Sequence, residues 1–420
     1  MTRVLVIGNG AREHVIARKL VDSGATLSSL MGSMNPGIAK MSEKAIIGDF
    51  HDRELLRKHF SNVEMAWVGP EAPLANGLTD FLTNELGIPT IGPTKTLARV
   101  ESSKTFTRQL LDEYNISGNP HFAVCQSIEE VEEFLRDFHS LAVKPDGLTG
   151  GKGVKVTGDH LLDEKATRGY ASQLIEADGV VLLEEKLVGQ EFSLQAFVDG
   201  RTITTMPIVQ DYKRAYDGDM GPNTGSMGSY SHQSHTLPFL PPNALAKSKE
   251  IMIKTVHALA DKTGQEYKGV LYGQFMLVGS TPYLIEYNVR FGDPEAMNVL
   301  ELLKTDLTEV GHRILDGSLT NVSFASQATT CVYLVPTGYP ETPNKNKIIT
   351  VDPNILNSSL YYASVAEENG QVVTTGSRAI GLVARGSTVE EAREIVYSDI
   401  KRGAVCGDLR HRGDIASNVR

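Results

Sequence analysis

The chain has 420 residues, of which 41% are hydrophobic and 22% charged, and its formal net charge is −10. This length exceeds one ordinary domain and the composition is that of a soluble globular protein, so two to four domains are expected. The acidic balance argues against a nucleic-acid binder, which has a basic excess, although a pocket for an anionic substrate can still be locally positive.

The first hundred residues alternate between short apolar strands and amphipathic helices. Strands are predicted at 3–7, 63–68 and 89–91, and a helix at 11–22. Strand–helix alternation predicts a parallel sheet with helices on both faces. A helix at 102–114 then follows.

From about residue 120 to 198 the pattern changes to helix plus short, paired strands, which predicts a small α+β lobe. The predicted strands are 141–144, 153–157, 180–185 and 192–198. Residues 211–231 are polar and glycine-rich, and this segment is too long to be a passive turn.

A long helix is predicted after that segment, followed by two strands and two further helices, at 243–264, 270–278, 282–288, 294–303 and 307–315. The remainder of the chain reads as mostly β, with a helix at 389–402.

The stretch GNGAREH, residues 8–14, follows the first strand and opens the first helix. Such a turn can bind an anion through free N–H groups at the helix N-terminus. Because Glu13 stands where a dinucleotide fingerprint needs its third glycine, NAD is disfavoured, and a phosphate-bearing substrate or a merely tight turn stays open. In GPEAPL, Glu71 follows another strand, where it could face a ligand or favour the helix dipole.

The stretch KPDGLTGGKGV, residues 144–154, combines four glycines with two lysines directly after an apolar run. Glycines allow backbone N–H groups to approach a phosphate closely, although a loose hairpin tip would have the same composition. In EEKLVGQEFS, Glu184, Glu185 and Glu191 flank a strand connection that could hold a ribose and an adenine edge or be simply solvated.

The most informative stretch is IEYNVRFGDPE, residues 285–295. Glu286 and Asn288 alternate on a strand and therefore share a face, which Arg290 extends if the strand continues. Two oxygen ligands beside an arginine suit Mg²⁺ bridging phosphates, with the arginine stabilising developing charge. Asp293 and the following Pro-Glu also read as an N-cap, a first-position proline and a first-turn acid.

The ordered set of motifs resembles the phosphoribosylamine–glycine ligases of the ATP-grasp superfamily over nearly the whole chain. The matching stretches are VLVIGNGAREH, GPEAPL, SKTF, VKPDGLTGGKGV, QDYKR, GPNTGSMG, GVLY and EYNVRFGDPE. The resemblance implies a multidomain α/β and α+β protein: an N-terminal parallel-sheet domain at 1–101, an ATP-grasp domain at 102–316 with lobes at about 120–198 and 199–316, and a mostly β domain at 327–420. It also implies ligation of glycine to 5-phosphoribosylamine, with ATP as cosubstrate and Mg²⁺ or Mn²⁺ as metal, in purine synthesis.

The resemblance assigns roles to individual positions. The implied catalytic residues are Lys144, Asp211, Lys213 and Arg290, and the implied metal ligands are Glu286 and Asn288. The implied ATP-binding residues are Lys104, Lys144, Gly147, Gly150, Gly151, Lys152, Gly153, Glu184, Glu185, Lys186, Val188 and Glu191. The implied substrate-binding residues are Asn9, Gly10, Glu13, Glu71, Asp211, Lys213, Pro222, Asn223, Thr224, Gly225, Arg290, Gly292 and Asp293.

Several stretches depart from the family's usual pattern. LYGQF stands for LYAGL and places Gln274 near the metal strand, while TTGSRAIGL and LRHRGDIA stand for TGGRVL and YRxDIG near the C-terminus. These departures put local substrate contacts in doubt and leave the ATP half of the resemblance intact.

Alternatives remain at this point: another ATP-grasp carboxylate–amine ligase, a nucleotide-binding regulatory protein, or, more distantly, a dinucleotide oxidoreductase. No nucleophile motif of a hydrolase or thiol enzyme is present, so covalent catalysis is not expected. Three widely spaced cysteines and the lack of a long apolar run predict a cytoplasmic protein without a membrane span. With the resemblance, we expect small-molecule substrates, no nucleic-acid partner, and a monomer or weak homodimer.

Overall fold

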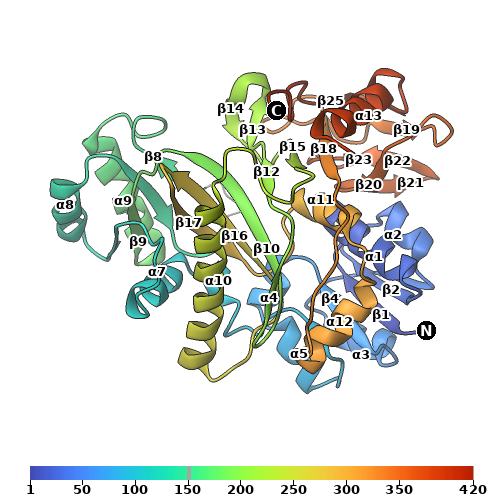
Figure 1. Cartoon of the computed structure of the whole chain (residues 1–420), viewed down its shortest axis with the longest axis horizontal. Helices are drawn as coiled ribbons and strands as arrows, with labels where there is room; N and C mark the ends of the chain where they lie inside the picture. Colours follow the sequence, from blue (N-terminus) through green and yellow to red (C-terminus); the bar gives the residue numbers. More distant parts are fainter. Residues whose placement is uncertain (149–152, 420) are drawn as a thin grey trace.

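The computed structural model describes residues 1–148 and 153–419 and places four parts around a long central sheet (Figure 1). The expected phosphate-loop residues Gly150, Gly151 and Lys152 lie outside the described residues.

The N-terminal part is a five-stranded parallel sheet in the order β3-β2-β1-β4-β5. Its strands are β1 Arg3–Ile7, β2 Thr26–Met31, β3 Lys44–Ile47, β4 Met65–Val68 and β5 Thr90–Ile91. Its helices are α1 Ala11–Asp22, α2 Pro36–Met41, α3 Arg53–Phe60, α4 Glu71–Ala75 and α5 Leu78–Asn84. The central strands β1 and β4 read as continuous apolar runs because helices cover both faces of a parallel sheet. The predicted architecture is confirmed.

The helix predicted at 102–114 is confirmed as α7 Lys104–Glu113, and a short helix that was not predicted, α6 Arg99–Ser102, precedes it. Ser103 between them is extended, and its hydroxyl accepts a hydrogen bond from the Phe106 amide as the N-cap of α7. A serine at this position starts a new helix because its side chain satisfies an otherwise free N–H group.

The small lobe is a four-stranded antiparallel sheet in the order β6-β9-β7-β8, covered by two helices. Its elements are β6 Phe122–Cys125, α8 Ile128–Asp137, β7 Leu141–Pro145, β8 Lys155–Val156, α9 Glu164–Asp178 and β9 Val181–Glu185. A separate hydrophobic core, which includes Val131, Val143 and Leu183, holds the lobe together. The predicted α+β lobe is present, but the strand predicted at 192–198 is not part of it, because as β10 Gln190–Asp199 it pairs within the sheet of the large lobe.

The large lobe is built on β10 Gln190–Asp199, β16 Lys268–Val278 and β17 Thr281–Asn288, with β16 paired to both neighbours. The other strands of this region are β11 Ile203–Thr205, β12 Val209–Asp211 and β15 Gly228–Ser231, and its helices are α10 Pro242–Thr263, α11 Glu295–Leu302 and α12 Leu307–Asp316. A separate hairpin, β13 Arg214–Tyr216 and β14 Met220–Asn223, projects beside this sheet (Figure 1).

The C-terminal part is mostly β, as predicted, and three of its strands extend the sheet of the large lobe. These are β18 Ala328–Pro336, β23 Ile380–Gly386 and β20 Ser359–Tyr362, joined through the pairing of β15 with β18. The remaining elements are β19 Ile348–Val351, β21 Val365–Glu368, β22 Gln371–Thr374, α13 Val389–Lys401, β24 Val405–Cys406 and β25 Leu409–Arg410. The shared sheet fixes the C-terminal part against the polar segment at 211–231.

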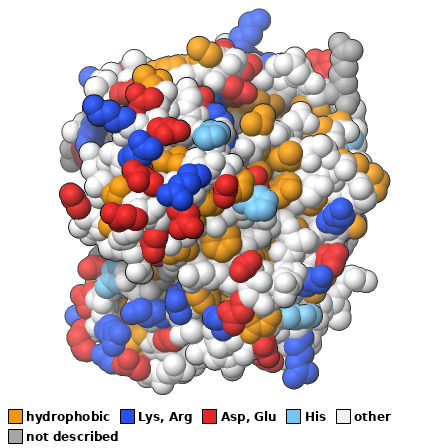
Figure 2. Space-filling view, turned by 90° about the vertical axis from the view of Figure 1, so that its left-hand side faces the viewer, with side chains coloured by type: hydrophobic (Ala, Val, Ile, Leu, Met, Phe, Trp, Pro, Cys, Tyr) orange, Lys and Arg blue, Asp and Glu red, His pale blue; other side chains and the backbone are white. Residues whose placement is uncertain are grey.

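Acidic and basic side chains are interspersed over the face that Figure 2 shows. Within residues 1–148 and 153–419, no helix is both long and apolar enough to cross a membrane.

Candidate active site

Two oxygen-bearing side chains share one face of β17. Glu286 lies opposite Gln274 of β16, and Asn288 lies opposite Tyr272. Both side chains are half-buried, and neither makes a hydrogen bond or ion pair with another described residue. Among the described residues no cluster of three or more His, Cys, Asp or Glu could hold a metal ion by itself. The pair therefore fits a divalent cation that takes its remaining ligands from phosphate and water.

Arg290 follows β17 and is held by two carboxylates from distant segments. Its Nε lies 3.3 Å from Glu71 Oε2, and its Nη2 lies 3.6 Å from Glu101 Oε1. The other oxygen of Glu101 accepts a hydrogen bond of 2.7 Å from the Val289 amide. The guanidinium is therefore oriented from both sides.

The pKa values of Glu71 and Glu101 shift in opposite directions. Burial would raise the pKa of Glu71, but Arg290 and Arg12 outweigh it and lower the pKa to about 2. Burial raises the pKa of Glu101 to about 7, against the opposing charge of Arg290. Glu71 is thus a fixed anion beside the arginine.

The glycine turn after β1 contacts the carboxylate of Glu13, which lies in the first turn of α1. Glu13 Oε2 accepts a hydrogen bond of 2.6 Å from the Gly10 amide, and Glu13 Oε1 lies 2.7 Å from Arg12 Nε. A Cβ at Gly69 would lie 2.1 Å from Glu13 Oε1, so this glycine makes room for the side chain. Because Glu13 occupies the helix N-terminus, the turn differs from a dinucleotide phosphate site.

Lys144, at the end of β7, belongs to a buried network with Glu184 and Arg108. Lys144 Nζ lies 2.7 Å from Glu184 Oε2, and Arg108 Nε lies 2.7 Å from Glu184 Oε1. Arg108 also donates a hydrogen bond of 2.8 Å to the Ile285 carbonyl on β17. Burial would raise the pKa of Glu184, but Arg108 and Lys144 hold it below the usual value.

We expect Arg108→Met to lower the free energy of unfolding by about 3 kcal/mol, because breaking a buried pair leaves an uncompensated charge while Lys144 still offsets part of it. Urea titration measures this loss. The matched control is Arg168→Met, which removes partly exposed pairs with Glu132 and Glu164 and should cost roughly 0.5 kcal/mol. Equal losses in the two variants would contradict the stabilising role of the buried network.

The described ends of the glycine-rich loop are both anchored. Lys104 Nζ donates a hydrogen bond of 2.7 Å to the Gly147 carbonyl, and the Tyr170 hydroxyl donates one of 2.6 Å to the Gly153 carbonyl. Burial and the nearby charge of Lys144 lower the pKa of Lys104, and Glu286 opposes that shift. Lys104 and Lys144 thus lie near each other, and Lys104 lies near the face of β17 that carries Glu286.

The connection between β9 and β10 is exposed at Val188 and Gly189, while the Glu185 and Lys186 amides donate hydrogen bonds to the carbonyls of His121 and Ser140. Glu185 accepts a hydrogen bond from the His121 amide, Lys186 bonds to the Thr157 carbonyl and Asp159, and Val188 is 75% exposed. At the start of β10, Glu191 Oε2 receives Lys213 Nζ at 2.5 Å and Gln274 Nε2 at 2.9 Å. Gln274 thus helps to orient the implied ribose acceptor.

Asp211 and Glu295 form an acidic pair next to Lys213. The Asp211 Oδ1 atom is buried and has no hydrogen-bond partner among the described residues. Burial raises the pKa of Asp211 to about 7, a shift that Lys213 opposes and Glu295 enhances. A buried carboxylate oxygen of this kind needs a donor, so the pair suits a small cationic group.

The N-cap predicted at Asp293 is wrong. Helix α11 begins at Glu295, with Pro294 at the cap position and no side-chain cap. Asp293 instead accepts a hydrogen bond of 2.5 Å from the Tyr333 hydroxyl and pairs with Arg378 at 3.1 Å. Both partners come from the C-terminal part, so tertiary contacts override the local capping preference.

The remaining predicted substrate residues come from three separate segments of the chain. Asn9 accepts a hydrogen bond from the Gly32 amide and donates one to the Ser33 hydroxyl, both just after β2, and the Gly292 amide donates to Gln195 Oε1. Pro222, Asn223, Thr224 and Gly225 form the exposed or half-exposed end of the β13–β14 hairpin. Arg378 donates hydrogen bonds to the carbonyls of Gly225 and Ser226.

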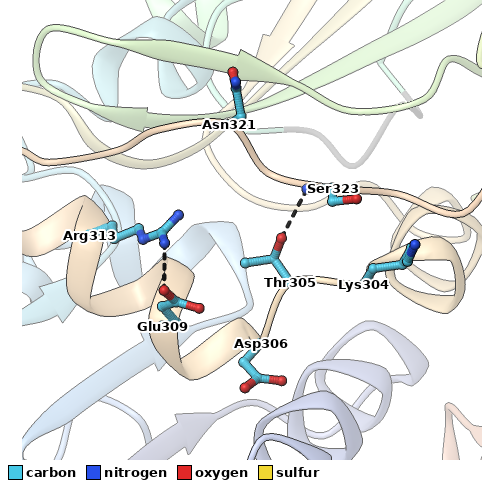
Figure 3. A pocket seen from close by; sticks show the side chains of 7 residues that line it. All are labelled: Lys304, Thr305, Asp306, Glu309, Arg313, Asn321 and Ser323. Carbon is cyan, nitrogen blue, oxygen red and sulfur yellow. Dashed lines mark hydrogen bonds and ion pairs between the residues drawn. The ribbon is translucent and has the colours of Figure 1, made fainter.

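An open pocket of about 440 Å³ lies apart from these residues, between the start of α12 and the segment at 321–323 (Figure 3). Its arginine, Arg313, pairs with Glu309, and Thr305 accepts a hydrogen bond from the Ser323 amide. None of its lining residues belongs to the predicted site.

Sequence reasoning missed Glu101, Arg108, Glu295 and Arg378 as parts of the site, and it noted Gln274 without a role. No quoted motif includes Arg108, which acts on a partner 76 residues away, whereas Arg378 lies within the quoted stretch TTGSRAIGL but received no role. Glu101 stands just before the SKTF stretch, and that position next to a nucleotide-binding lysine is the one signal that could have identified it.

Comparisons with known proteins agree along the whole chain. Residues 2–101, 102–296 and 329–418 match the family models of the N domain, the ATP-grasp (A) domain and the C domain of phosphoribosylglycinamide synthetase. A phosphoribosylamine–glycine ligase of Methanosarcina barkeri is 46% identical over 99% of this chain and 96% of its own length.

Solved structures are also similar. The phosphoribosylamine–glycine ligase of Thermotoga maritima is 31% identical, with a TM-score of 0.84 over 99% of this chain and all of that one. An N5-carboxyaminoimidazole ribonucleotide synthetase of the same organism is 14% identical, with a TM-score of 0.66 over 97% of this chain and 99% of that one, and shows the fold alone. With the ATP-grasp fold and all three matched domains, the chain belongs to the phosphoribosylglycinamide synthetase family.

Proposed function

We propose that the chain ligates glycine to 5-phosphoribosylamine, with ATP converted to ADP and phosphate, to give glycinamide ribonucleotide in purine biosynthesis. The observation that carries this proposal is the full-length match to relatives named phosphoribosylamine–glycine ligase, together with the convergence of Lys104, Lys144, Lys213, Glu286 and Arg290.

In this proposal ATP lies between the two lobes. Lys104 and Lys144 bind the phosphates, the backbone from Glu185 to Val188 reads the adenine, and Glu191 accepts the ribose hydroxyls. Because Glu184 is already paired with Arg108 and Lys144, its side chain orients the lysine and does not contact the base. The glycine-rich stretch would cover the phosphates.

Glu286 and Asn288 would hold Mg²⁺ or Mn²⁺. A bound divalent cation neutralises phosphate charge and makes the γ-phosphorus more electrophilic. Arg290, fixed by Glu71 and Glu101, would stabilise the charge that develops on the transferred phosphoryl group.

Asp211 and Glu295 would hold the ammonium group of glycine, which supplies the missing donor for Asp211 Oδ1. Gly8 to Glu13, Glu71 and the residues from Pro222 to Gly225 would bind the phosphoribosylamine. The glycine carboxylate then attacks the γ-phosphorus and ADP leaves. The amine next attacks the acyl carbon of glycyl phosphate, releasing inorganic phosphate and a proton.

Two measurements test this function. ADP formation should require both glycine and phosphoribosylamine, and bicarbonate or D-alanine supporting turnover in place of glycine would refute the glycine specificity. Glycine labelled with oxygen-18 in its carboxylate should pass one labelled oxygen to inorganic phosphate per turnover. Label in AMP with release of pyrophosphate would refute the acyl-phosphate route and favour an adenylate.

We expect the kcat/KM for glycine to fall as the pH drops below about 7, because Asp211 must be ionised to hold the ammonium group and its pKa is about 7. Lys213 faces this carboxylate and favours ionisation, while Glu295 and Glu191 disfavour it. At pH 6 about a tenth of the groups are ionised, so the decrease should approach tenfold. A flat profile between pH 6 and 8, or an unchanged profile in Asp211→Asn, would contradict this role.

We also propose the domain division 1–101, 102–316 and 327–420, with the boundary between the two lobes just before β10, near residue 189, because β10 pairs within the sheet of the large lobe. The matched family ranges and the separate core of the small lobe support it.

A further inference from the structure

The β13–β14 hairpin and its flanking residues have little core of their own. Ala215 is the only described residue between 213 and 225 that is buried, and the two strands form a sheet by themselves. An isolated two-stranded hairpin is marginally stable in water. Nevertheless, the residues just before this hairpin include Asp211 and Lys213, which must be placed accurately for the proposed reaction.

The C-terminal residues 410–416, here called the clasp segment, run along this hairpin (Figure 1). The Arg412 side chain is fully buried and donates hydrogen bonds to the Arg214 carbonyl at 3.0 Å and to Asp219 at 2.9 Å. Arg410 donates one of 2.8 Å to the Ala215 carbonyl. The guanidinium of Arg412 also lies over the Tyr212 ring, 5.2 Å from its centroid.

Backbone amides of the hairpin and of the clasp segment make further hydrogen bonds. Asp414 accepts a hydrogen bond of 2.8 Å from the Gly218 amide and two from Arg412. The Gly413 amide donates to Asp217, and the Ala416 amide donates to the Tyr212 hydroxyl at 3.0 Å. The contacts with the clasp segment thus hold Tyr212, which precedes Lys213 in the sequence, and the hairpin, which follows it.

The clasp segment is itself fixed to α13. The Tyr397 hydroxyl donates to the Arg412 carbonyl, and Arg393 donates to the carbonyls of Gly413 and Ile415. The helix, the clasp segment and the hairpin therefore form one hydrogen-bonded unit that ends at Lys213, whose ammonium group contacts Glu191.

We propose that Arg412 is a positioning residue: through Tyr212 and the Arg214 carbonyl it holds Lys213 and Asp211 in place for the binding of glycine. This inference rests on the proposed function. It also gives the C-terminal stretch LRHRGDIA, in which Arg412 and Asp414 keep the arginine and aspartate of the family pattern, a role in the substrate site without direct contact to substrate.

The test compares Arg412→Met with a matched control, Arg402→Met, which removes a pair with Asp399 and a bond to the Ile355 carbonyl in the same part of the fold. In Arg412→Met we expect trypsin to cut after Lys213 or Arg214 at least ten times faster than in the wild type. We also expect kcat/KM for glycine to fall at least tenfold, while ADP affinity changes less than threefold. The control should match the wild type in all three measurements.

Tyr212→Phe provides a milder variant if Arg412→Met does not fold, because it removes only the acceptor for the Ala416 amide. In this variant we expect trypsin cleavage to be about three times faster and kcat/KM for glycine about threefold lower than in the wild type. Unchanged cleavage, unchanged glycine kinetics, or an equal loss of ADP affinity in the folded variant would overturn the inference. A wild-type enzyme without glycine-dependent ADP formation would refute the proposed function instead, and the cleavage rates would still report whether Arg412 holds the hairpin.

Discussion

Glu286→Gln is expected to reduce kcat by roughly 10²–10³, and Asn288→Ala by a similar factor, which corresponds to about 2.7–4 kcal/mol of transition-state stabilisation. Both side chains share the face of β17 next to Lys104 and Lys213, and neither is committed to another described partner. Glu286→Gln replaces a charged oxygen ligand with a neutral one, and Asn288→Ala removes an oxygen ligand, so in both variants the cation is held less tightly and phosphate charge is less well neutralised as the phosphoryl group transfers.

The measurement is steady-state turnover as a function of magnesium concentration. Each variant should need more magnesium for half-maximal activity and should keep a lower kcat at saturation. Glu266→Gln is the control, since it removes an exposed pair with Arg201 just before β16 and should leave turnover unchanged. Near-normal kcat in both site variants at saturating magnesium would show that the metal lies elsewhere.

Arg290→Met should also reduce kcat by roughly 10²–10³, the scale for losing one preorganised electrostatic contact. The guanidinium is held between Glu71 and Glu101 before any ligand binds, so little reorganisation is needed when charge develops. Arg290→Lys keeps the charge but cannot contact both carboxylates in the planar geometry of arginine, so it should recover only part of the loss.

This prediction is checked by single-turnover measurement of ADP formation with saturating substrates, which reports the chemical step. Arg3→Met is the control, because Arg3 makes an exposed pair with Glu64 at 3.3 Å and lies in the N-terminal sheet. If Arg290→Met forms ADP within threefold of the wild-type rate, the transferred phosphoryl group is stabilised by another residue.

The sequence alone determined the local structure and the chemistry of the site. Apolar runs that alternate with amphipathic helices specify the N-terminal parallel sheet, because strands buried on both faces need continuous hydrophobicity. The two-residue period of a strand places Glu286 and Asn288 on one face, as the structure shows. Both patterns depend on residues that are close together in the sequence, and for that reason they can be predicted from it.

Only the tertiary structure decided which charges are paired and which remain available. Arg108 reaches Glu184 across 76 residues, and Arg412 reaches Asp219 across 193. Such pairs leave no periodic signal, because burial and partner choice depend on how the lobes pack. The same packing turned Asp293 from a predicted helix cap into a partner of Tyr333 and Arg378, since a charged hydrogen bond to buried groups outweighs one capping bond on a short helix.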